Sequence, residues 1–414
     1  MKYFFSRNLY YSMFALSFCL LYVIGPALSS YLNNQGYYKP FDNAILYQAA
    51  LFFSLFSLSY FFFKNITKNK KQKTKNKKQK RYRPVRKYIY TIPLALTGLA
   101  LMLYFVKNGF VISKLDGYET RYTANVGAGI YTQFMQLFYF FIAGLIYKKG
   151  VDSPKRLILI SLAFFVITFA LLGGHRQLGL GVIIGIFFYL MLEKKISPHS
   201  FLIIFIPFLI FSLAIAVLRY ENDSLDIEQI IKFVIIFFYD GLTPTEAHTN
   251  ILQYVHSNGY PGLSIITNQF GAYIPRDIWT DKPLMMLNGG NYYTSIVLGR
   301  TSVVTYSPTL LGELILAHGP YFYFAAIPTG VLFCAIDRSV NARTYFGITM
   351  ILFSFTIIFN FYREGLYVFL TKIIFIFIFS RIFYAISRTK PKRSPPVNSY
   401  TQPPTSAYMN KKHA

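Results

Sequence analysis

The sequence predicts an all-α integral membrane protein that crosses the bilayer about ten times. The first observation is composition: 54% of the 414 residues are hydrophobic and 14% are charged, whereas soluble proteins carry about a quarter charged residues. The second is that the apolar residues come in runs of about 17–22, long enough to cross a bilayer as helices. These features exclude a collagen, a disulfide scaffold and a free nucleic-acid-binding domain.

The predicted spans follow one another along a single polytopic domain, 1–414, and their ends are good to a few residues. Several contain glycine or proline, which membrane helices tolerate. In chain order they cover residues 9–29, 44–63, 88–106, 129–147, 157–172, 178–192, 201–218, 320–336, 344–362 and 366–384.

The connections between the spans sort by charge. If the N-terminus is cytoplasmic and the sides alternate, the cytoplasmic segments hold 30 basic and 3 acidic residues, and the rest of the chain holds 12 basic and 13 acidic residues. This asymmetry, about +27 inside against −1 outside, is the bias that sets the orientation of membrane proteins. Both termini are therefore expected in the cytoplasm. The first run is long and no small-residue cleavage site follows it, so we interpret it as a span and not as a signal peptide.

Two basic segments are expected to be disordered. Residues 64–87 (KNITKNKKQKTKNKKQKRYRPVRK) and the proline-rich tail 386–414 are polar and positive, so neither can bury a core. A cytoplasmic loop of this kind rests on anionic lipid headgroups, and we favour this interpretation over a role in binding nucleic acid.

The predicted outer connections are richer in sequence features. They comprise the loop 107–128, the tight turn GGHRQ at 173–177, a long connection 219–319 and the turn Arg363-Glu364-Gly365 between the last two spans. Within the long connection, 226–240 is amphipathic and is expected to lie along the interface, or to form an additional short span. Residues 307–319 have helical spacing and are expected to re-enter or follow the membrane.

Arginines gather on this outer side, which the charge bias disfavours. Arg176, Arg219 and Arg363 each end an apolar run on the same face. A single arginine of this kind could snorkel to a carbonyl or a nearby acid. For the three together an anionic ligand is the better explanation, because guanidinium groups bind phosphate bidentately and keep their charge. A lipid diphosphate has its headgroup at this depth.

Several cofactor motifs are missing. The sequence has no P-loop, no glycine-rich dinucleotide turn, no metal-ligand spacing among its histidines and cysteines, and no Asp-x-Asp to hold a metal-bound sugar nucleotide. If a sugar is transferred, we therefore expect a lipid-linked donor, a metal-independent reaction and no cofactor. The two cysteines, Cys19 and Cys334, both lie in apolar runs and are expected to be packing residues.

An ordered series of short motifs resembles the enterobacterial common antigen polymerase family, whose members are Wzy-type oligosaccharide repeat-unit polymerases. The series covers about three-quarters of the chain; each motif alone is weak, and the order is fairly specific. Two features depart from the family pattern: loop 64–87 is longer and more basic, and Arg276, Asp277, Arg300 and Glu313 lie where no fixed acid or base is expected. The matching motifs are NGF at 108–110, GG-x-R at 173–176, Arg219-Tyr220, Asp240…Pro244…Glu246, the IP…W…P…N…NY skeleton at 274–292, SPTL with glycine at 307–312, and REG at 363–365.

The resemblance implies a reaction on the periplasmic face of the inner membrane. The reducing-end sugar of a growing glycan leaves undecaprenyl diphosphate and passes to a hydroxyl of an incoming lipid-linked repeat unit. For the common antigen this unit is a trisaccharide of an N-acetylated aminofucose, N-acetylmannosaminuronic acid and N-acetylglucosamine. The kinship also implies a fold like that of other membrane transferases with lipid-linked donors, and two protein partners, a chain-length regulator and a flippase of the same pathway.

The reaction then suggests roles for the outer residues. Arg176, Arg219 and Arg363 are expected to stabilise the leaving diphosphate, with Lys282 as a further cation. Glu246 is the first candidate for the proton acceptor and Asp240 the second. An N-terminal cap or a salt bridge is an equal alternative for Glu246. Glu364 is expected to pair with Arg363, and His248 could be a base or a structural residue. The residues expected to hold sugar are Trp279, Asn288, Asn291, Tyr292 and Tyr293, although aromatic residues at such a boundary often form only an interfacial belt.

Three other classes of protein stay open. A flippase or transporter would need polar groups along a path through the membrane and usually has repeat symmetry. Here charges inside the predicted spans are nearly absent, with Lys372 the main exception. An O-antigen-type ligase would share the same chemistry and differ only in its acceptor. A structural or sensory membrane protein would leave the outer arginines unexplained.

Overall fold

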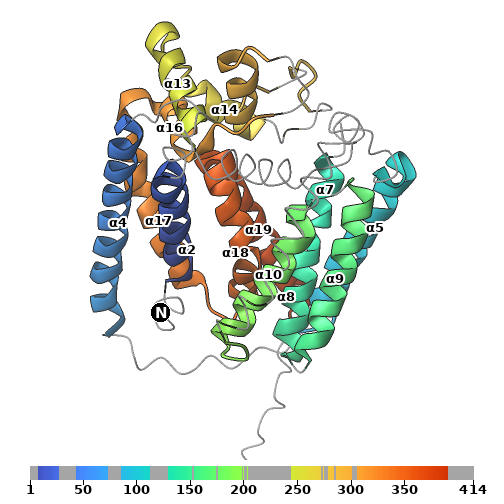
Figure 1. Ribbon diagram of the computed structural model, residues 1–414. Helices are drawn as coiled ribbons and strands as arrows, with labels where there is room; N and C mark the ends of the chain where they lie inside the picture. The colour runs from blue at the N-terminus through green and yellow to red at the C-terminus, as the bar shows by residue number, and fades with distance from the viewer. Residues whose placement is uncertain are drawn as a thin grey trace, which may run out of the picture.

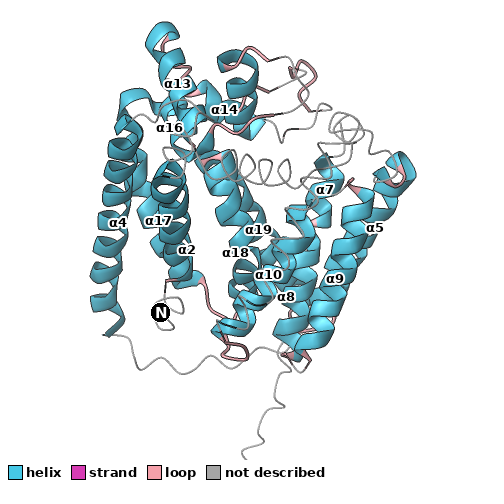
Figure 2. Cartoon of the chain, viewed as in Figure 1, coloured by secondary structure: helices cyan, strands magenta, loops and turns pink. Residues whose placement is uncertain are grey.

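A computed structural model shows a bundle of long helices with shorter helices packed over one end (Figure 1). It describes residues 8–27, 43–72, 85–111, 129–151, 153–173, 176–197, 199, 203, 244–271, 274, 278–283, 286–300 and 305–389. All regular elements of these residues are helices (Figure 2), apart from one isolated β-bridge between Val85 and Arg388. The prediction of an all-α fold is confirmed for this part of the chain.

The helices follow one another in the order that the apolar runs predict. Their bounds are α2 (Leu9–Cys19), η1 (Leu20–Ile24), α4 (Asn43–Gln72), α5 (Tyr88–Asn108), α7 (Gly129–Met135), α8 (Leu137–Lys149), α9 (Pro154–Leu171), α10 (Arg176–Leu192), α13 (Thr245–Asn258), α14 (Ser264–Gly271), α15 (Gly289–Tyr292), η3 (Tyr293–Val297), α16 (Thr309–His318), η4 (Gly319–Ala325), α17 (Ala326–Ser339), α18 (Tyr345–Glu364) and α19 (Leu366–Ser387).

Eight helical segments within the described ranges are long and apolar enough to span a membrane. Seven of them match the predicted spans closely. The eighth, Thr309–Ser339, is longer than the predicted 320–336 because it also includes α16, which ends at Gly319 with φ +59° before η4 and α17 follow. A ninth apolar helix, Gln177–Leu192, is shorter and corresponds to the predicted span 178–192. All of the amphipathic segment 226–240, and the predicted span 201–218 apart from residue 203, lie outside the described residues.

The predicted boundaries of the basic segments shift slightly. Helix α4 continues to Gln72, into the beginning of the basic loop 64–87, and residues 73–84 of that loop lie outside the described part. Arg86 at its end donates its backbone N–H to the Ser387 carbonyl at 2.8 Å, so the start of α5 contacts the end of α19. The tail beyond residue 389 is also outside the described part.

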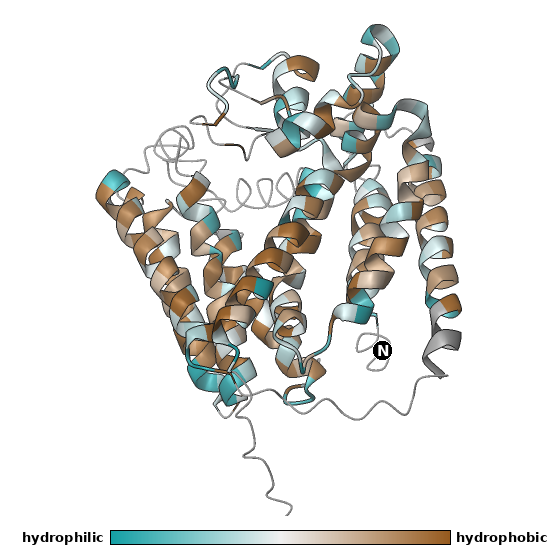
Figure 3. Cartoon of the chain, turned by 180° about the vertical axis from the view of Figure 1, so that it is seen from behind, coloured by the Kyte–Doolittle hydropathy of each residue, from teal (hydrophilic) through white to brown (hydrophobic). Residues whose placement is uncertain are grey.

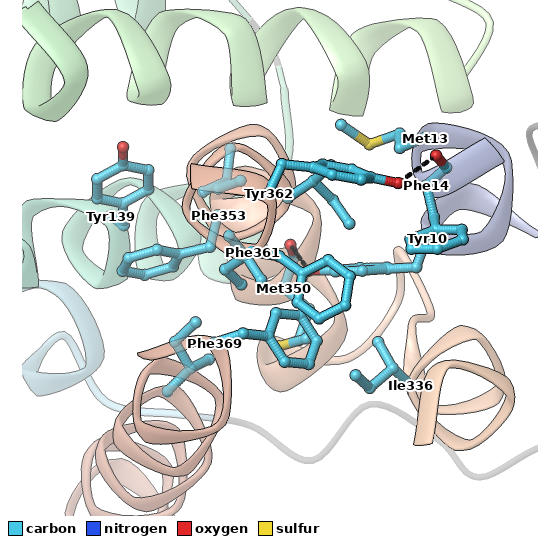
Figure 4. Close-up of a cluster of buried hydrophobic side chains, with 14 of the residues drawn as sticks. Tyr10, Met13, Phe14, Tyr139, Ile336, Met350, Phe353, Phe361, Tyr362 and Phe369 are labelled. Atoms are coloured by element: carbon cyan, nitrogen blue, oxygen red, sulfur yellow. Dashed lines mark hydrogen bonds between the residues drawn. The ribbon is translucent and has the colours of Figure 1, made fainter. Parts of the chain in front are cut away.

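Helix α18 forms the centre of the bundle and is buried along nearly its whole length. Its aromatic side chains interlock with those of α2 and α19 (Figure 4), and Tyr10 and Tyr362 donate hydrogen bonds across the α2–α18 contact to the carbonyls of Met350 and Phe14. On its other side α18 packs closely against α10. A Cβ at Gly185 of α10 would overlap with the Leu352 carbonyl, so only glycine allows this approach.

The two ends of the bundle differ. Apolar residues dominate the middle of the long helices, and polar residues concentrate at their ends and in the short helices above (Figure 3). Helices α13, α14 and α16 lie together over one end (Figure 1), which we call the capped end. The chain enters α2 at the opposite end, near the N label of Figure 1.

Asp337 fastens the first helix at the end opposite the capped end. Its Oδ1 accepts the Tyr10 N–H at 2.8 Å, and its Oδ2 accepts the Tyr11 N–H at 3.2 Å and the Tyr60 hydroxyl at 2.8 Å. A carboxylate at the start of a helix satisfies otherwise unpaired N–H groups and favours the helix dipole. Asp337 therefore connects α17 to α2 and α4.

We expect Asp337→Ala to lower the stability of the protein by about 2–3 kcal/mol, because three partly buried donors lose their charged acceptor. The measurement is the Tm of the purified protein in detergent, followed by size-exclusion chromatography. Glu193→Ala is the control, since Glu193 is exposed and accepts no hydrogen bond through its side chain in the described structure. An unchanged Tm for Asp337→Ala would contradict this role.

Candidate functional site

The turn between α18 and α19 lies at the capped end, and we call its three residues, Arg363-Glu364-Gly365, the REG turn. Gly365 has φ +98° and ψ −177°, a backbone conformation that is open almost only to glycine. The Arg363 side chain is exposed, while its carbonyl accepts a hydrogen bond from the Ser307 hydroxyl. The turn thus presents a guanidinium group from a backbone that is held in place.

Helix α16 also packs against the REG turn, through the side chain of Glu313. Glu313 is completely buried, and its Oε2 accepts the N–H of Tyr367 in the first turn of α19 at 3.3 Å. The Tyr367 hydroxyl is hydrogen-bonded to His318 Nε2 at 2.5 Å. A Cβ at Gly365 would overlap with the Glu313 carboxyl group, so the turn packs directly against it. The segment 307–318 therefore contacts the REG turn through Ser307 and Glu313, and the start of α19 through Glu313 and His318.

A second turn, residues 286–292, packs against the side chain of Glu313. A Cβ at Gly289 would lie 3.0 Å from Glu313 Cγ and 3.2 Å from its Oε1. Asn288 caps α15 by accepting the Asn291 N–H at 3.1 Å, and Asn291 Nδ2 donates to the Met286 carbonyl at 2.7 Å. Both asparagines hold the shape of this turn. Thr305 donates a further hydrogen bond to Asn291 Oδ1 at 3.2 Å.

Aromatic side chains extend this region towards α13. The hydroxyls of Tyr254 and Tyr292 are 2.9 Å apart, and burial together with this contact raises the pKa of Tyr292. Tyr293 is buried beside Asn250, and burial raises its pKa to about 12; the hydrogen bond from Asn250 and the charge of Arg300 oppose this increase, and the charge of Glu246 adds to it. Both phenols are therefore neutral hydrogen-bonding groups at any physiological pH.

Glu246 itself is exposed in the first turn of α13, where the helix dipole favours a carboxylate. One turn further along α13, Asn250 donates a hydrogen bond to the Tyr293 hydroxyl at 3.4 Å, so this part of the helix lies beside Tyr293. Arg300 stacks on the ring of Tyr306, with its guanidinium carbon 4.6 Å from the ring centre. An acid, a cation and several aromatic residues thus line one side of the capped end.

Helix α10 approaches the site from the opposite side of α18. Gln177 Nε2 donates a hydrogen bond to Oδ1 of the buried Asn360, which lies one turn before Arg363. Arg176 is the first residue of α10, and its side chain falls outside the described part of the chain. Arg176 therefore directly precedes in sequence a residue that contacts α18 one turn before Arg363.

Other predicted site residues lie elsewhere or are engaged within the loops. Buried His248 contacts Gln48 of α4 through Nε2 at 2.6 Å, a geometry that favours its structural alternative. Lys282 Nζ donates to the Ile274 carbonyl at 2.8 Å. Trp279 is 36% exposed and packs near Gly271. Arg219 and Asp240 are outside the described residues. Glu364 acts electrostatically on Glu313 and on Lys372 of α19.

Glu313, for which the resemblance implies no fixed role, lies between the two glycine turns that carry Arg363 and the asparagines. A signal was present in the sequence, because it is the one acid in the apolar helix TLLGELILAH. Among the described residues no group of three or more His, Cys, Asp or Glu side chains could hold a metal ion.

Comparison with known families agrees with the motif series. A family described as "WzyE protein, O-antigen assembly polymerase" matches residues 2–388, which is nearly the whole chain. No solved structure matches the chain. The resemblance noted from the sequence is thereby confirmed. The chain belongs to the WzyE family, whose members are multi-pass membrane enzymes that polymerise lipid-linked repeat units.

Proposed function

We propose that this protein polymerises undecaprenyl-diphosphate-linked oligosaccharide units on the periplasmic face of the inner membrane, and that its unit is the common antigen trisaccharide. The observation that carries the proposal is the REG turn, which offers an exposed guanidinium at the capped end and packs against the same residue, Glu313, as the 286–292 turn. Family membership and the outer arginines of the sequence support it. The positive-inside bias supports a periplasmic capped end, with both chain termini in the cytoplasm.

The proposed chemistry is a single displacement. The acceptor hydroxyl oxygen attacks the anomeric carbon of the donor sugar, the bond from that carbon to the diphosphate oxygen breaks, and the diphosphate leaves with the electron pair. Arg363, Arg176 and Arg219 stabilise the charge that develops on it, and Lys282 is a further cation at the same face. Guanidinium groups suit this task because each can donate two parallel hydrogen bonds to phosphate oxygens.

The acceptor hydroxyl gives its proton to a carboxylate in this proposal. Glu246 is the first candidate, since it is exposed in the first turn of α13, one turn before Asn250, which contacts Tyr293. Asp240 is the second candidate. Glu364 places the guanidinium of Arg363, and His248 supports α13 from below through its contact with Gln48.

Aromatic and amide groups bind the sugar rings. Trp279 and Tyr292 supply flat faces, and Asn288 and Asn291 shape the turn on which the saccharide rests. A chain-length regulator and a flippase act with the enzyme, and the protein needs no cofactor and binds no nucleic acid.

Purified protein incubated with a synthetic undecaprenyl-diphosphate trisaccharide tests this function. A ladder of repeats that remains on the lipid carrier is the expected product. Transfer of glycan to a different acceptor with no ladder would point to a ligase. Transbilayer movement of the lipid in vesicles, again with no ladder, would point to a flippase. Either of these results would overturn the proposal.

Ladder formation is expected to be unchanged by EDTA, within about twofold, because fixed guanidinium groups take the place of a divalent cation at the leaving diphosphate. The measurement is the initial rate of elongation before and after chelation, with Mg²⁺ added back as the control. A loss of activity that Mg²⁺ or Mn²⁺ restores would contradict this expectation.

A further inference from the structure

Glu313 has an unusual environment for a carboxyl group. It is 0% exposed, and its Oε1 has no hydrogen-bond partner among the described residues. Removing a carboxyl group from water is unfavourable unless it is paired or hydrogen-bonded, and a leucine would fill an apolar helix face with less penalty. The carboxyl group is therefore explained by what it contacts and not by packing.

The first contact is with the start of α19. Oε2 accepts the Tyr367 N–H at 3.3 Å, at the end of the helix where the dipole favours a negative group. The carboxyl group also lies against Gly365, where a side chain would overlap with it. Because Arg363 is two residues before Gly365, the position of its backbone depends on this contact and on the Ser307 hydrogen bond.

The second contact is with the 286–292 turn. The Glu313 side chain lies against Gly289, whose Cβ position is 3.0 Å from Cγ and 3.2 Å from Oε1. Asn288 precedes this glycine and Asn291 follows it by two residues. One side chain thus touches both turns, and its two oxygens lie between them.

We propose that Glu313 is a positioning residue, which fixes the separation between Arg363 and the turn that carries Asn288 and Asn291. This inference rests on the proposed function, in which Arg363 binds the diphosphate and that turn supports the sugar. The two groups then meet the donor on either side of the bond that breaks. A small displacement of one turn from the other misaligns the diphosphate with the sugar, and such errors cost about 100-fold in rate.

Two substitutions with opposite expectations test this role. Glu313→Gln keeps an acceptor oxygen for the Tyr367 N–H and nearly the same shape, so kcat stays within about tenfold of the wild type. Glu313→Leu fills the space and removes the acceptor, so kcat falls about 100-fold while KM changes little. If Glu313 had only a structural role, Glu313→Leu would be at least as stable and as active as Glu313→Gln, because leucine in a buried apolar helix maintains or raises the Tm.

The experiment measures kcat and KM for elongation of the synthetic lipid-diphosphate trisaccharide, and the Tm, for the wild type and both variants at equal amounts of folded protein. An active Glu313→Leu enzyme overturns the inference. So does a Glu313→Gln enzyme as inactive as Glu313→Leu, since the negative charge and not the hydrogen bond would then matter. If the wild type itself forms no ladder, the proposed function fails first and this inference fails with it.

Coupling to Arg363 gives a second readout in the same assay. If Glu313 acts through the REG turn, adding Glu313→Leu to Arg363→Lys lowers kcat by less than about tenfold beyond Arg363→Lys alone. Independent effects would multiply to the full 100-fold loss, and that result would contradict an action through Arg363.

Discussion

Arg363→Ala abolishes chain elongation, with kcat at least about 10³-fold below the wild type, while the protein still inserts and accumulates. Removing one preorganised donor that stabilises developing charge typically costs 10²–10³-fold, and a charged bidentate donor is at the upper end of this effect. The side chain is exposed and its loss leaves no cavity, so the fold is maintained. Arg176→Ala is expected to have the same outcome.

Lysine at either position is expected to restore only part of the activity, about 10- to 100-fold below the wild type. It keeps the charge but offers a single point donor in place of the planar fork. The measurement is elongation by purified variants, with the chain-length ladder in cells as a second readout. Arg343→Ala is the matched control, because Arg343 is exposed at the opposite end of the bundle, just before α18 begins.

Normal ladders from Arg363→Ala and Arg176→Ala would refute their assignment. Labelling from the two compartments supplies a separate test. Cysteines placed at 176 and 363 are expected to react with an impermeant reagent from the periplasm, and reaction only from the cytoplasm would reverse the proposed orientation of the capped end.

The spans were predictable from the sequence because membrane helices are defined by length and apolar content alone. Seven of the eight candidate spans therefore match their predicted ranges. The eighth, Thr309–Ser339, includes α16 ahead of the predicted span 320–336, but α16 ends at Gly319, whose φ of +59° and ψ of −139° interrupt the helix. Gly319 and Pro320 indicate this interruption in the sequence, and α16 falls within the segment 307–319 for which helical spacing was predicted separately.

The site was less predictable because its geometry depends on contacts between distant segments. The sequence predicted that Arg363, Asn288 and Asn291 lie on one face of the membrane. It did not predict that Glu313 lies between the two turns that carry them. The NGF motif at 108–110, which matches the family pattern, has a local structural explanation. Gly109 has φ +66° and ends α5, with its N–H bonded to the Phe105 carbonyl at 2.7 Å.

Gly365→Ala is expected to lower the elongation rate at least about 100-fold, although it adds a single methyl group. Two effects combine at this position. The φ/ψ values of Gly365 are accessible almost only to glycine, which costs of the order of 1–3 kcal/mol for another residue. The added Cβ would also overlap with the Glu313 carboxyl group, so either the turn or α16 has to move. Any such movement displaces the Arg363 backbone next to it.

Gly259→Ala separates these two effects. Gly259 ends α13 with φ +78° and ψ −171°, nearly the same backbone conformation, and nothing lies within 4 Å of its Cβ position. Both variants therefore bear a similar backbone strain, and only Gly365→Ala collides with Glu313. We expect the Tm to fall in both variants, and further in Gly365→Ala because the overlap adds to the strain, with elongation lost only in Gly365→Ala. Equal elongation rates would mean that the contact between Gly365 and Glu313 has no part in catalysis, because strain alone would then account for every effect at the REG turn.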